Sequence, residues 1–167
     1  MVFNFNCILC ILVHIRVCFI RYSILTEFMF KEKQKSLFPR DATDLFLEYC
    51  KDIDEWPDRW EIDEEDIKIG RDIVEQFKPF IVSLIEKGLS KKTVKSYRDY
   101  LWALGGELIR QINEDGSERR LSARELILKH VDNYGGPYWR HAYNESDEAK
   151  YDSVCKRFFK FITEKTG

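Results

Sequence analysis

From residue 41 onward, apolar residues recur every three or four positions, and this spacing limits the fold more than any other feature of the sequence. Three stretches show it, and their apolar residues are Ile69, Ile73, Phe77, Phe80, Ile81, Leu84 and Ile85; Val94, Tyr97, Leu101, Leu104, Leu108 and Ile112; and Tyr151, Val154, Cys155, Phe158, Phe159 and Ile162. Such spacing places apolar side chains on one face of a helix. The sequence after residue 30 contains no convincing strand pattern. We therefore predict an all-α fold, a small helical bundle.

Residues that cap or stop helices predict where the first long helix begins and ends and where the second begins. Asp63 is a candidate N-cap, followed by three acidic residues that suit the positive end of the helix dipole. Pro79 predicts a kink or a new start within the first helix, and Gly88 predicts its end. Ser90 is expected to cap the helix that follows.

The second long helix contains two adjacent glycines, Gly105 and Gly106, in the middle of its pattern. Each costs about 1 kcal/mol relative to alanine in a helix, and a neighbouring helix that crosses closely over the gap would offset this cost. Ser122 and Glu125 then form a capping-box pattern, which predicts a short middle helix. A glycine-rich break precedes the last helix, which is expected to begin at Ser146 or Asp147.

Two shorter segments precede the long helices. Residues 41–51 carry apolar residues at helical spacing and predict a short helix. After it, Trp56 and Trp60 flank Pro57 in the stretch WPDRW. Proline lacks the backbone N–H that a regular helix needs, so this stretch is predicted to be a turn with two aromatic anchors.

Charge is divided unevenly along the chain, although the whole sequence is close to neutral. Residues 1–40 hold 6 Lys and Arg against 2 Asp and Glu, residues 41–88 hold 6 against 15, and residues 89–167 hold 15 against 12. This pattern can mean that a basic site is partly covered by an acidic partner, or that acidic and basic helices pair within one fold. We favour the second interpretation, with an acidic helical segment, residues 29–88, packed on a domain formed by residues 89–167.

The first 28 residues form an apolar extension that is unlike the rest of the chain. Its longest run without a charged residue ends at Arg16, which is shorter than the roughly 20 residues of a membrane-spanning helix. It also lacks the cationic start and the cleavage site of a signal peptide. We therefore expect no membrane insertion, although the cations that follow would hold the rest of the chain in the cytoplasm if it inserted. A start at Met29 is the interpretation that we favour.

The five cysteines form no regular framework, which favours a reducing, cytoplasmic setting. The spacing of Cys7, Cys10, His14 and Cys18 allows a zinc site in principle. However, the residues between these four lack the glycine or polar turn of a zinc knuckle. The acidic run near Pro57 also lacks the glycine that a calcium loop requires. We therefore expect no metal or other cofactor.

Two groups of cations are candidates for contact with nucleic acid. The first group begins the helix after Ser90, where the dipole makes cations mildly unfavourable, whereas a bound phosphate would reverse that effect. The second group lies on the last helix, beside two phenylalanines. Both groups would also fit the solvated edges of ordinary amphipathic helices. The candidate DNA-binding residues are Lys91, Lys92, Thr93, Lys95, Arg98, Lys156, Arg157 and Lys160.

The order of three helical segments points to a more specific function than the cations alone. The segments are LSKKTVKSYRDYLWALGGELI, LSARELILKHV and DEAKYDSVCKRFFKFITEK, and together they cover about Leu89 to Lys165. This order resembles the SAM-like core-binding domain that precedes the catalytic domain of tyrosine recombinases and phage integrases. Thr93 and Tyr97 match the T-x-x-x-Y segment of its first helix. The aromatic run that matches the end of its last helix is Phe158, Phe159 and Phe161.

The resemblance implies a small helical bundle that clasps duplex DNA. The family's catalytic arginines, its His-x-x-Arg segment and its tyrosine nucleophile are not found in this sequence, in which they would follow Gly167. We therefore expect a non-catalytic DNA-binding module and not an enzyme. The double glycine and the insertion YGGPYWRHAY depart from the family pattern.

The rival hypothesis is a protein-interaction module that binds no nucleic acid. In it, the acidic helix meets a partner or a second copy of the chain, and Trp56 and Trp60 are partly exposed anchors. A third hypothesis is that the acidic segment 52–66 masks the basic helices until a partner removes it. Each of these hypotheses depends on which of these residues are exposed.

Overall fold

The computed structural model describes residues 41–164, and the prediction of an all-α fold is confirmed. This part of the chain contains six α-helices, two 3-10 helices and no strand. The elements are α2 (Ala42–Tyr49), η1 (Ile53–Glu55), α3 (Trp56–Trp60), α4 (Asp66–Glu86), α5 (Lys91–Glu114), η2 (Gly116–Arg120), α6 (Ala123–His130) and α7 (Glu145–Glu164). The apolar extension, the start at Met29 and the four possible zinc ligands all lie outside the described residues.

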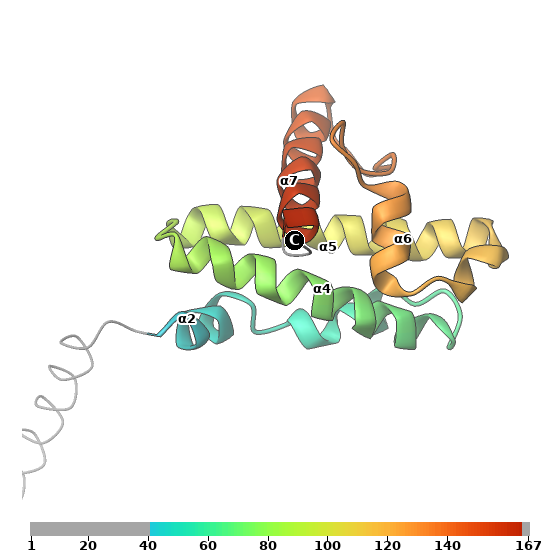
Figure 1. Cartoon of the computed structure of the whole chain (residues 1–167), viewed down its shortest axis with the longest axis horizontal. Coiled ribbons are helices and arrows are strands. Elements are labelled where there is room, and N and C mark those ends of the chain that lie inside the picture. The colour runs from blue at the N-terminus through green and yellow to red at the C-terminus, as the bar shows by residue number, and fades with distance from the viewer. Residues whose placement is uncertain (1–40, 165–167) are drawn as a thin grey trace, which may run out of the picture. The chain divides into compact units, whose positions relative to one another are not determined.

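The chain divides into the units Met1–Asp41 and Ala42–Gly167, and the described helices belong to the second. Helix α4 packs against every other α-helix described in this unit. Figure 1 shows α4 and α5 side by side, with α2 and α3 along α4, and with α7 standing across the two long helices. The segment that precedes Gly88 is therefore part of the same core as α5, α6 and α7.

The core joins the apolar stripes that the periodicity predicts. Ile73 and Phe77 of α4 and Leu101 of α5 are all fully buried. Aromatic rings link α4 to α7, because Phe158 lies 5.2 Å from Phe77 and 5.4 Å from Phe80, measured between ring centroids. The predicted apolar faces therefore become one shared interior.

Helix α4 begins later than predicted and passes through its proline. Its N-cap is Glu65, not Asp63, and the carboxylate of Asp66 accepts the backbone N–H of Asp63 at 2.9 Å. The prediction for Asp63 was wrong because α4 begins three residues later, and the Asp66 carboxylate accepts the N–H groups of Ile62 and Asp63 in the turn before the helix. Pro79 does not start a new helix, since α4 continues to Glu86. Pro79 is exposed, and the carbonyl four residues before it can bind water.

The predicted ends between α4 and α5 are confirmed. Gly88 has a φ of 74°, and its N–H donates to Ile85 O while the N–H of Leu89 donates to Leu84 O. This is a complete Schellman motif. Ser90 caps α5 by accepting the N–H of Thr93.

The capping box of α6 is also confirmed. The side chain of Ser122 accepts the N–H of Glu125, and the carboxylate of Glu125 accepts the N–H of Ser122. Helix α6 ends at His130, close to the predicted end of the middle helix. Helix α7 starts at Glu145, one residue before the predicted Ser146. Local capping chemistry therefore sets most of the helix bounds in this part of the chain.

The stretch WPDRW is helix α3, and its tryptophans are buried. Pro57 occupies the first turn of α3, where its missing N–H would have no partner within the helix, so the prediction of a turn was wrong. Trp56 is 1% exposed and Trp60 is 6% exposed. A methyl group added to Gly105 would lie 2.2 Å from the Trp60 ring, so this indole fills the gap that the double glycine leaves.

The burial of Trp56 and Trp60 corrects two hypotheses. The two residues cannot act as partly exposed anchors for a partner, because their indoles pack inside the bundle. The segment 52–66 also cannot be a removable mask, because Ile53, Trp56 and Trp60 all contribute to the core. Moving this segment away would expose a large apolar area to water.

Candidate nucleic-acid interface

Two of the candidate DNA-binding residues hold helix α2 and the turn after it against α5. The ammonium of Lys91 lies 2.5 Å from the carboxylate of Glu48 and 5.2 Å from the ring centroid of Tyr49. The guanidinium of Arg98 donates to the carbonyl of Tyr49 at 2.9 Å and lies 3.6 Å from the carboxylate of Asp52. Lys91 and Arg98 therefore have structural roles, and Arg98 is only 21% exposed in its side chain.

Lys92 and Lys95 of the same helix are exposed. Neither forms an ion pair with another residue of the described part of the chain. Thr93 is exposed, but its hydroxyl lies 2.9 Å from that of Ser90 and its N–H donates to the same cap. Thr93 therefore completes the helix cap, while Lys92 and Lys95 have no such role.

The second group of cations lies on α7, which contacts α5. Lys156, Arg157 and Lys160 are exposed. The guanidinium of Arg157 donates to the hydroxyl of Tyr97 on α5 and lies 5.7 Å from the centroid of that ring. Lys160 lies 3.7 Å from Glu164, and both of these side chains are exposed, so this pair contributes little to stability.

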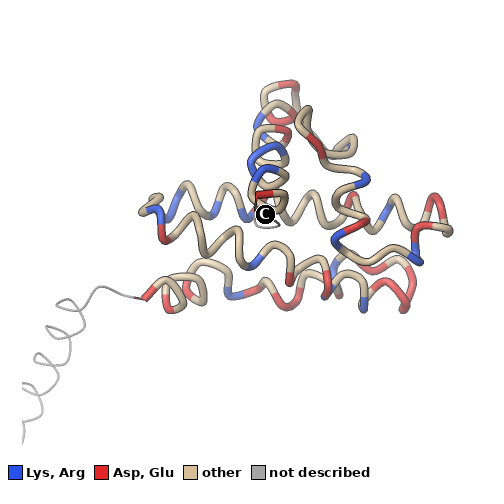
Figure 2. The backbone as a smooth tube through the Cα atoms, in the orientation of Figure 1, with Lys and Arg blue, Asp and Glu red and all other residues tan. Residues whose placement is uncertain are grey.

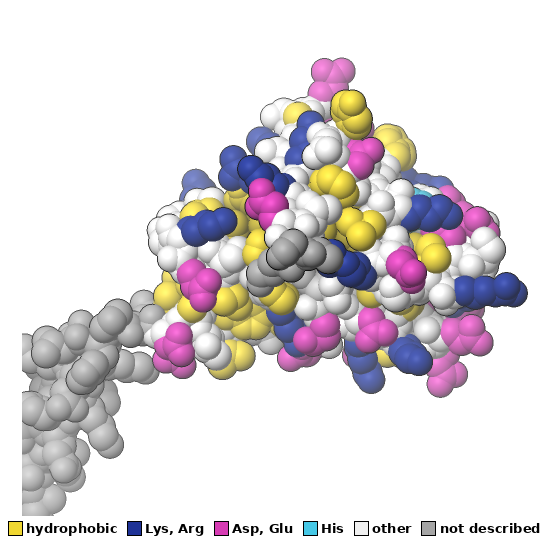
Figure 3. Space-filling model, in the orientation of Figure 1, with side chains coloured by type: hydrophobic (Ala, Val, Ile, Leu, Met, Phe, Trp, Pro, Cys, Tyr) yellow, Lys and Arg dark blue, Asp and Glu magenta, His cyan; other side chains and the backbone are white. Residues whose placement is uncertain are grey.

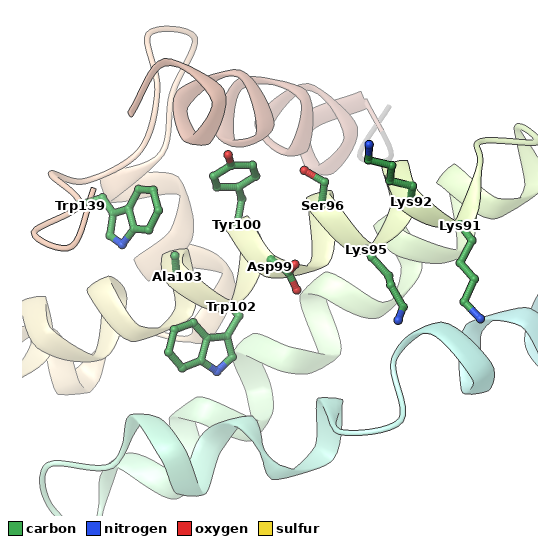
Figure 4. A pocket seen from close by; sticks show the side chains of 9 residues that line it. All are labelled: Lys91, Lys92, Lys95, Ser96, Asp99, Tyr100, Trp102, Ala103 and Trp139. Carbon is green, nitrogen blue, oxygen red and sulfur yellow. The ribbon is translucent and has the colours of Figure 1, made fainter. Parts of the chain in front are cut away.

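We call the five exposed cations of α5 and α7 together the basic corner; the two helices contact each other, and Lys92 and Lys95 point to opposite sides of α5 (Figure 4). Figure 3 shows Lys and Arg side chains gathered beside α7, above the first half of α5, whereas Figure 2 shows acidic residues along α2, α3 and the start of α4. The Arg157–Tyr97 contact joins the two helices at this point. The basic corner consists of Lys92, Lys95, Lys156, Arg157 and Lys160.

A groove of about 800 Å³ runs along the exposed side of α5, next to the basic corner. Figure 4 shows lysines at one end of it, and Trp102 and Trp139 on either side of Ala103 at the other end. Trp102 is 43% exposed, and Trp139 is partly buried on the connection between α6 and α7. The groove is lined by Lys91, Lys92, Lys95, Ser96, Asp99, Tyr100, Trp102, Ala103 and Trp139.

The predicted site did not include these two tryptophans. Trp102 lies between Leu101 and Leu104 but outside the apolar stripe of α5, so the helical pattern puts it on the surface without indicating a function. Trp139 belongs to the insertion YGGPYWRHAY, whose position beside α5 only the fold reveals. Its ring meets the Tyr100 ring edge-on, with centroids 5.9 Å apart.

At the opposite end of α5, charged groups are buried and paired. Asp66 is 1% exposed, and its carboxylate accepts hydrogen bonds from Asn113 at 2.9 Å and Arg119 at 2.7 Å. Burial opposes ionisation of this carboxyl, but hydrogen bonds from Asp63, Asn113, Ile62 and Arg119 outweigh it and lower its pKa. Asp66 thereby ties the start of α4 to the end of α5 and to η2.

A second carboxylate near this end of α5, that of Glu118, is also buried and paired with cationic or ring-nitrogen groups. Glu118 is 5% exposed, and its oxygens lie 2.6 Å from both the ammonium of Lys129 and the ring nitrogen of His130. Burial again opposes ionisation, but the hydrogen bonds from Lys129 and His130 prevail and lower the pKa of Glu118. These contacts fasten η2 to α6, so His130 has a structural explanation.

Other chemistry finds no support among residues 41–164. No group of His, Cys, Asp and Glu in this range is arranged to hold a metal ion. None of the helices in this range has the length and apolar character needed to cross a membrane. Burial raises the pKa of Cys50 to about 11 and that of Cys155 to about 12, so both remain protonated thiols near neutral pH.

Comparison with known proteins found no match among protein-family models, curated proteins or solved structures. The geometry of the basic corner and of the groove is therefore the basis for any functional assignment.

Proposed function

We propose that this protein is a non-catalytic DNA-binding module that contacts duplex DNA mainly through its phosphates. The observation that carries the proposal is the basic corner, the exposed cations on the two contacting helices α5 and α7. The proposal also draws on the resemblance of residues 89–167 to the core-binding domain of tyrosine recombinases, in which the corresponding helices clasp DNA. Lysine and arginine on a convex helical surface are typical of phosphate contacts that do not read the base sequence.

The fold itself gives no reason for several of these cations. Lys92, Lys95 and Lys156 form no ion pair with the rest of residues 41–164. Lys92 also lies in the first turn of α5, where the helix dipole disfavours a positive charge by a few tenths of a kcal/mol, roughly. A phosphate beside these side chains would turn an unfavourable arrangement into a favourable one.

The proposed contact set is narrower than the set predicted from the sequence. Lys91 and Arg98 are engaged with α2 and the turn that follows it, and Thr93 with the helix cap. The proposed phosphate contacts are therefore the five residues of the basic corner.

The experiment that tests this function is fluorescence anisotropy of the full chain with a labelled blunt duplex, titrated at several salt concentrations. A triple variant, Lys92→Glu, Lys95→Glu and Lys156→Glu, should bind much more weakly. Because each lost phosphate contact removes about 0.9 from the slope of log K against log salt, the slope should fall by roughly 3.

The matched control reverses three exposed cations near the start of α4 and in η2. These are Lys68, Arg71 and Arg120, each changed to Glu. Both triple variants alter the net charge equally, so a loss of binding that is confined to the first identifies the basic corner. Equal binding by the two folded variants, or no binding of duplex by the unchanged chain at low salt, would overturn the proposal.

A further inference from the structure

The groove beside the basic corner is lined by two tryptophans, Trp102 and Trp139, which the proposed phosphate contacts do not explain. Trp102 and Trp139 lie on either side of Ala103, whose small side chain leaves the space between the two indoles open (Figure 4). Trp102 is 43% exposed although its helix has a well-filled core face. The exposed part of the Trp102 indole can therefore contact a ligand.

The position of Trp139 is held by its neighbours. Its ring lies 5.9 Å from that of Tyr100, edge-on, and 5.4 Å from that of Tyr151, both measured between centroids. Tyr151 is itself 1% exposed, so Trp139 rests on the core of the bundle. The indole of Trp139 is therefore held in place before a ligand binds, which reduces the entropy that is lost when a flat ligand stacks on it.

The charges along the groove favour an anion that extends from the aromatic end. Lys92 and Lys95 line it, and the exposed hydroxyl of Ser96 lies next to them. Asp99 is the one carboxylate in the lining, and it is paired with Arg98 at 2.7 Å. The ligand is therefore expected to have a flat apolar part and a chain of negative charges.

The spacing agrees with a short nucleic-acid strand. Ala103 and Lys95 are eight residues apart on α5, which is roughly 12 Å at 1.5 Å per residue. At the 3.4 Å spacing of phosphates along one strand of a stacked duplex this length holds about three phosphates, and an unstacked strand, which is more extended, places fewer there. A helical peptide would instead need an apolar strip over several turns, whereas the large apolar residues in the lining are only Tyr100, Trp102 and Trp139.

We infer that the groove binds a short single-stranded segment of DNA, with an unpaired base between Trp102 and Trp139 and its phosphates on Lys95 and Lys92. This inference rests on the proposed function and names its substrate class: duplex DNA that carries an overhang, a flap or a gap. In an intact duplex the faces of the bases are stacked on one another, so they cannot reach the indoles. An unpaired base exposes its face, and aromatic stacking on it is independent of sequence.

The test compares three labelled DNAs with the full chain by anisotropy. The first is a blunt duplex, the second is the same duplex with a six-nucleotide thymine overhang, and the third has abasic spacers in place of the thymines. The overhang should tighten binding by about tenfold through base stacking, and the abasic overhang, which keeps the phosphates, should lose most of that gain.

Two variants locate the effect. Trp102→Ala replaces a half-exposed indole by a good helix former and should abolish the gain from the overhang while leaving the affinity for blunt duplex unchanged. Ser96→Glu leaves both indoles in place but puts a negative charge in the groove, and it should also remove the gain. The matched control is Tyr143→Ala, which removes a 90% exposed aromatic side chain outside the groove and should preserve it.

The outcomes separate the inference from the function on which it rests. Equal binding of the blunt and overhang duplexes would overturn the inference and leave the proposed function standing. Equal binding of the thymine and abasic overhangs, or competition by a polyglutamate peptide as strong as that by the overhang, would overturn base stacking. Binding of the overhang strand alone, without any binding of blunt duplex, would support the groove and overturn the duplex proposal. No binding of any of the DNAs would overturn both.

Discussion

Helix α5 carries cations near both of its ends, and the two ends use them differently. Near the C-terminal end, Arg110 donates to Glu107 and Glu114 at 2.6 Å, and Asn113 donates to the buried Asp66. Near the N-terminal end, Lys92 and Lys95 extend into solvent.

The difference lies in what each end joins. The C-terminal end meets α4 and η2, and the carboxylates of Asp66, Glu107 and Glu118 are buried there, so they must be paired to avoid a large desolvation penalty. The N-terminal end is covered on one side by α2, which engages Lys91 and Arg98, and is open on the other. Paired and buried charges hold this fold together, whereas exposed and unpaired charges are available for a ligand.

The largest expected loss of stability comes from removing the buried carboxylate of Asp66 near the C-terminal end of α5. Asp66→Ala removes the acceptor of Arg119 Nη1 and of two backbone N–H groups, and should lower the free energy of unfolding by about 3 kcal/mol. Urea denaturation measures this loss. The control is Asp72→Ala on the exposed side of the same helix, which should change stability by less than about 0.5 kcal/mol. A similar loss in both variants would contradict the distinction between the two ends.

Lowering the pH should weaken the contacts of Asp66 and Glu118, near the C-terminal end of α5, without any substitution. The folded-state pKa values of Asp66 and Glu118 are both lowered, so their stabilisation is present above the unfolded-state pKa values. It is lost as the pH falls below roughly 4, where these carboxyls take up protons. Urea midpoints between pH 6 and pH 3 measure this, and the decline should be shallower in Asp66→Ala. The same decline in both proteins would show that other groups cause it.

A smaller effect is expected where α2 is fastened to the N-terminal end. Arg98→Ala removes the hydrogen bond to the carbonyl of Tyr49 and the ion pair with Asp52, and should cost about 1.5 kcal/mol. The matched control is Lys95→Ala on the same helix, which should cost less than about 0.5 kcal/mol. If the two variants are equally stable by urea denaturation, Arg98 has no fastening role.

The smallest effect should have the opposite sign. Lys92→Glu replaces a cation by an anion in the first turn of α5, and should raise the free energy of unfolding by about 0.5 kcal/mol through the helix dipole. The same variant should bind duplex DNA more weakly, so stability and binding should move in opposite directions. Thermal denaturation and anisotropy on one sample measure both, and a loss of stability would mean that Lys92 has a structural partner.

Much of the fold could be read from local chemistry. The three apolar stripes, the Schellman end at Gly88, the Ser90 cap and the capping box of α6 each depend on residues within a few positions of one another. The errors at Asp63 and Pro57 came from features that local rules leave open. The carboxylate of a first helical residue can accept N–H groups from the turn before the helix, and a proline can begin a short helix as well as end one.

The candidate site was less predictable. The sequence located the cations of α5 and α7, but not which of them would be taken up by other parts of the fold. Lys91 and Arg98 resemble Lys92 and Lys95 in sequence, yet α2 engages the first two and leaves the others in solvent. Partners that lie more than forty residues away cannot be inferred from the spacing of charges.

By itself, the sequence determined that residues 41–164 are mainly helical, because periodicity and capping act over distances of three to five residues. It also determined that its charges are unevenly divided. Only the tertiary structure decided that Trp56 and Trp60 are buried while Trp102 is exposed. The reason is physical: the burial of a side chain depends on which helix packs over it, and that contact joins residues that are far apart in the sequence.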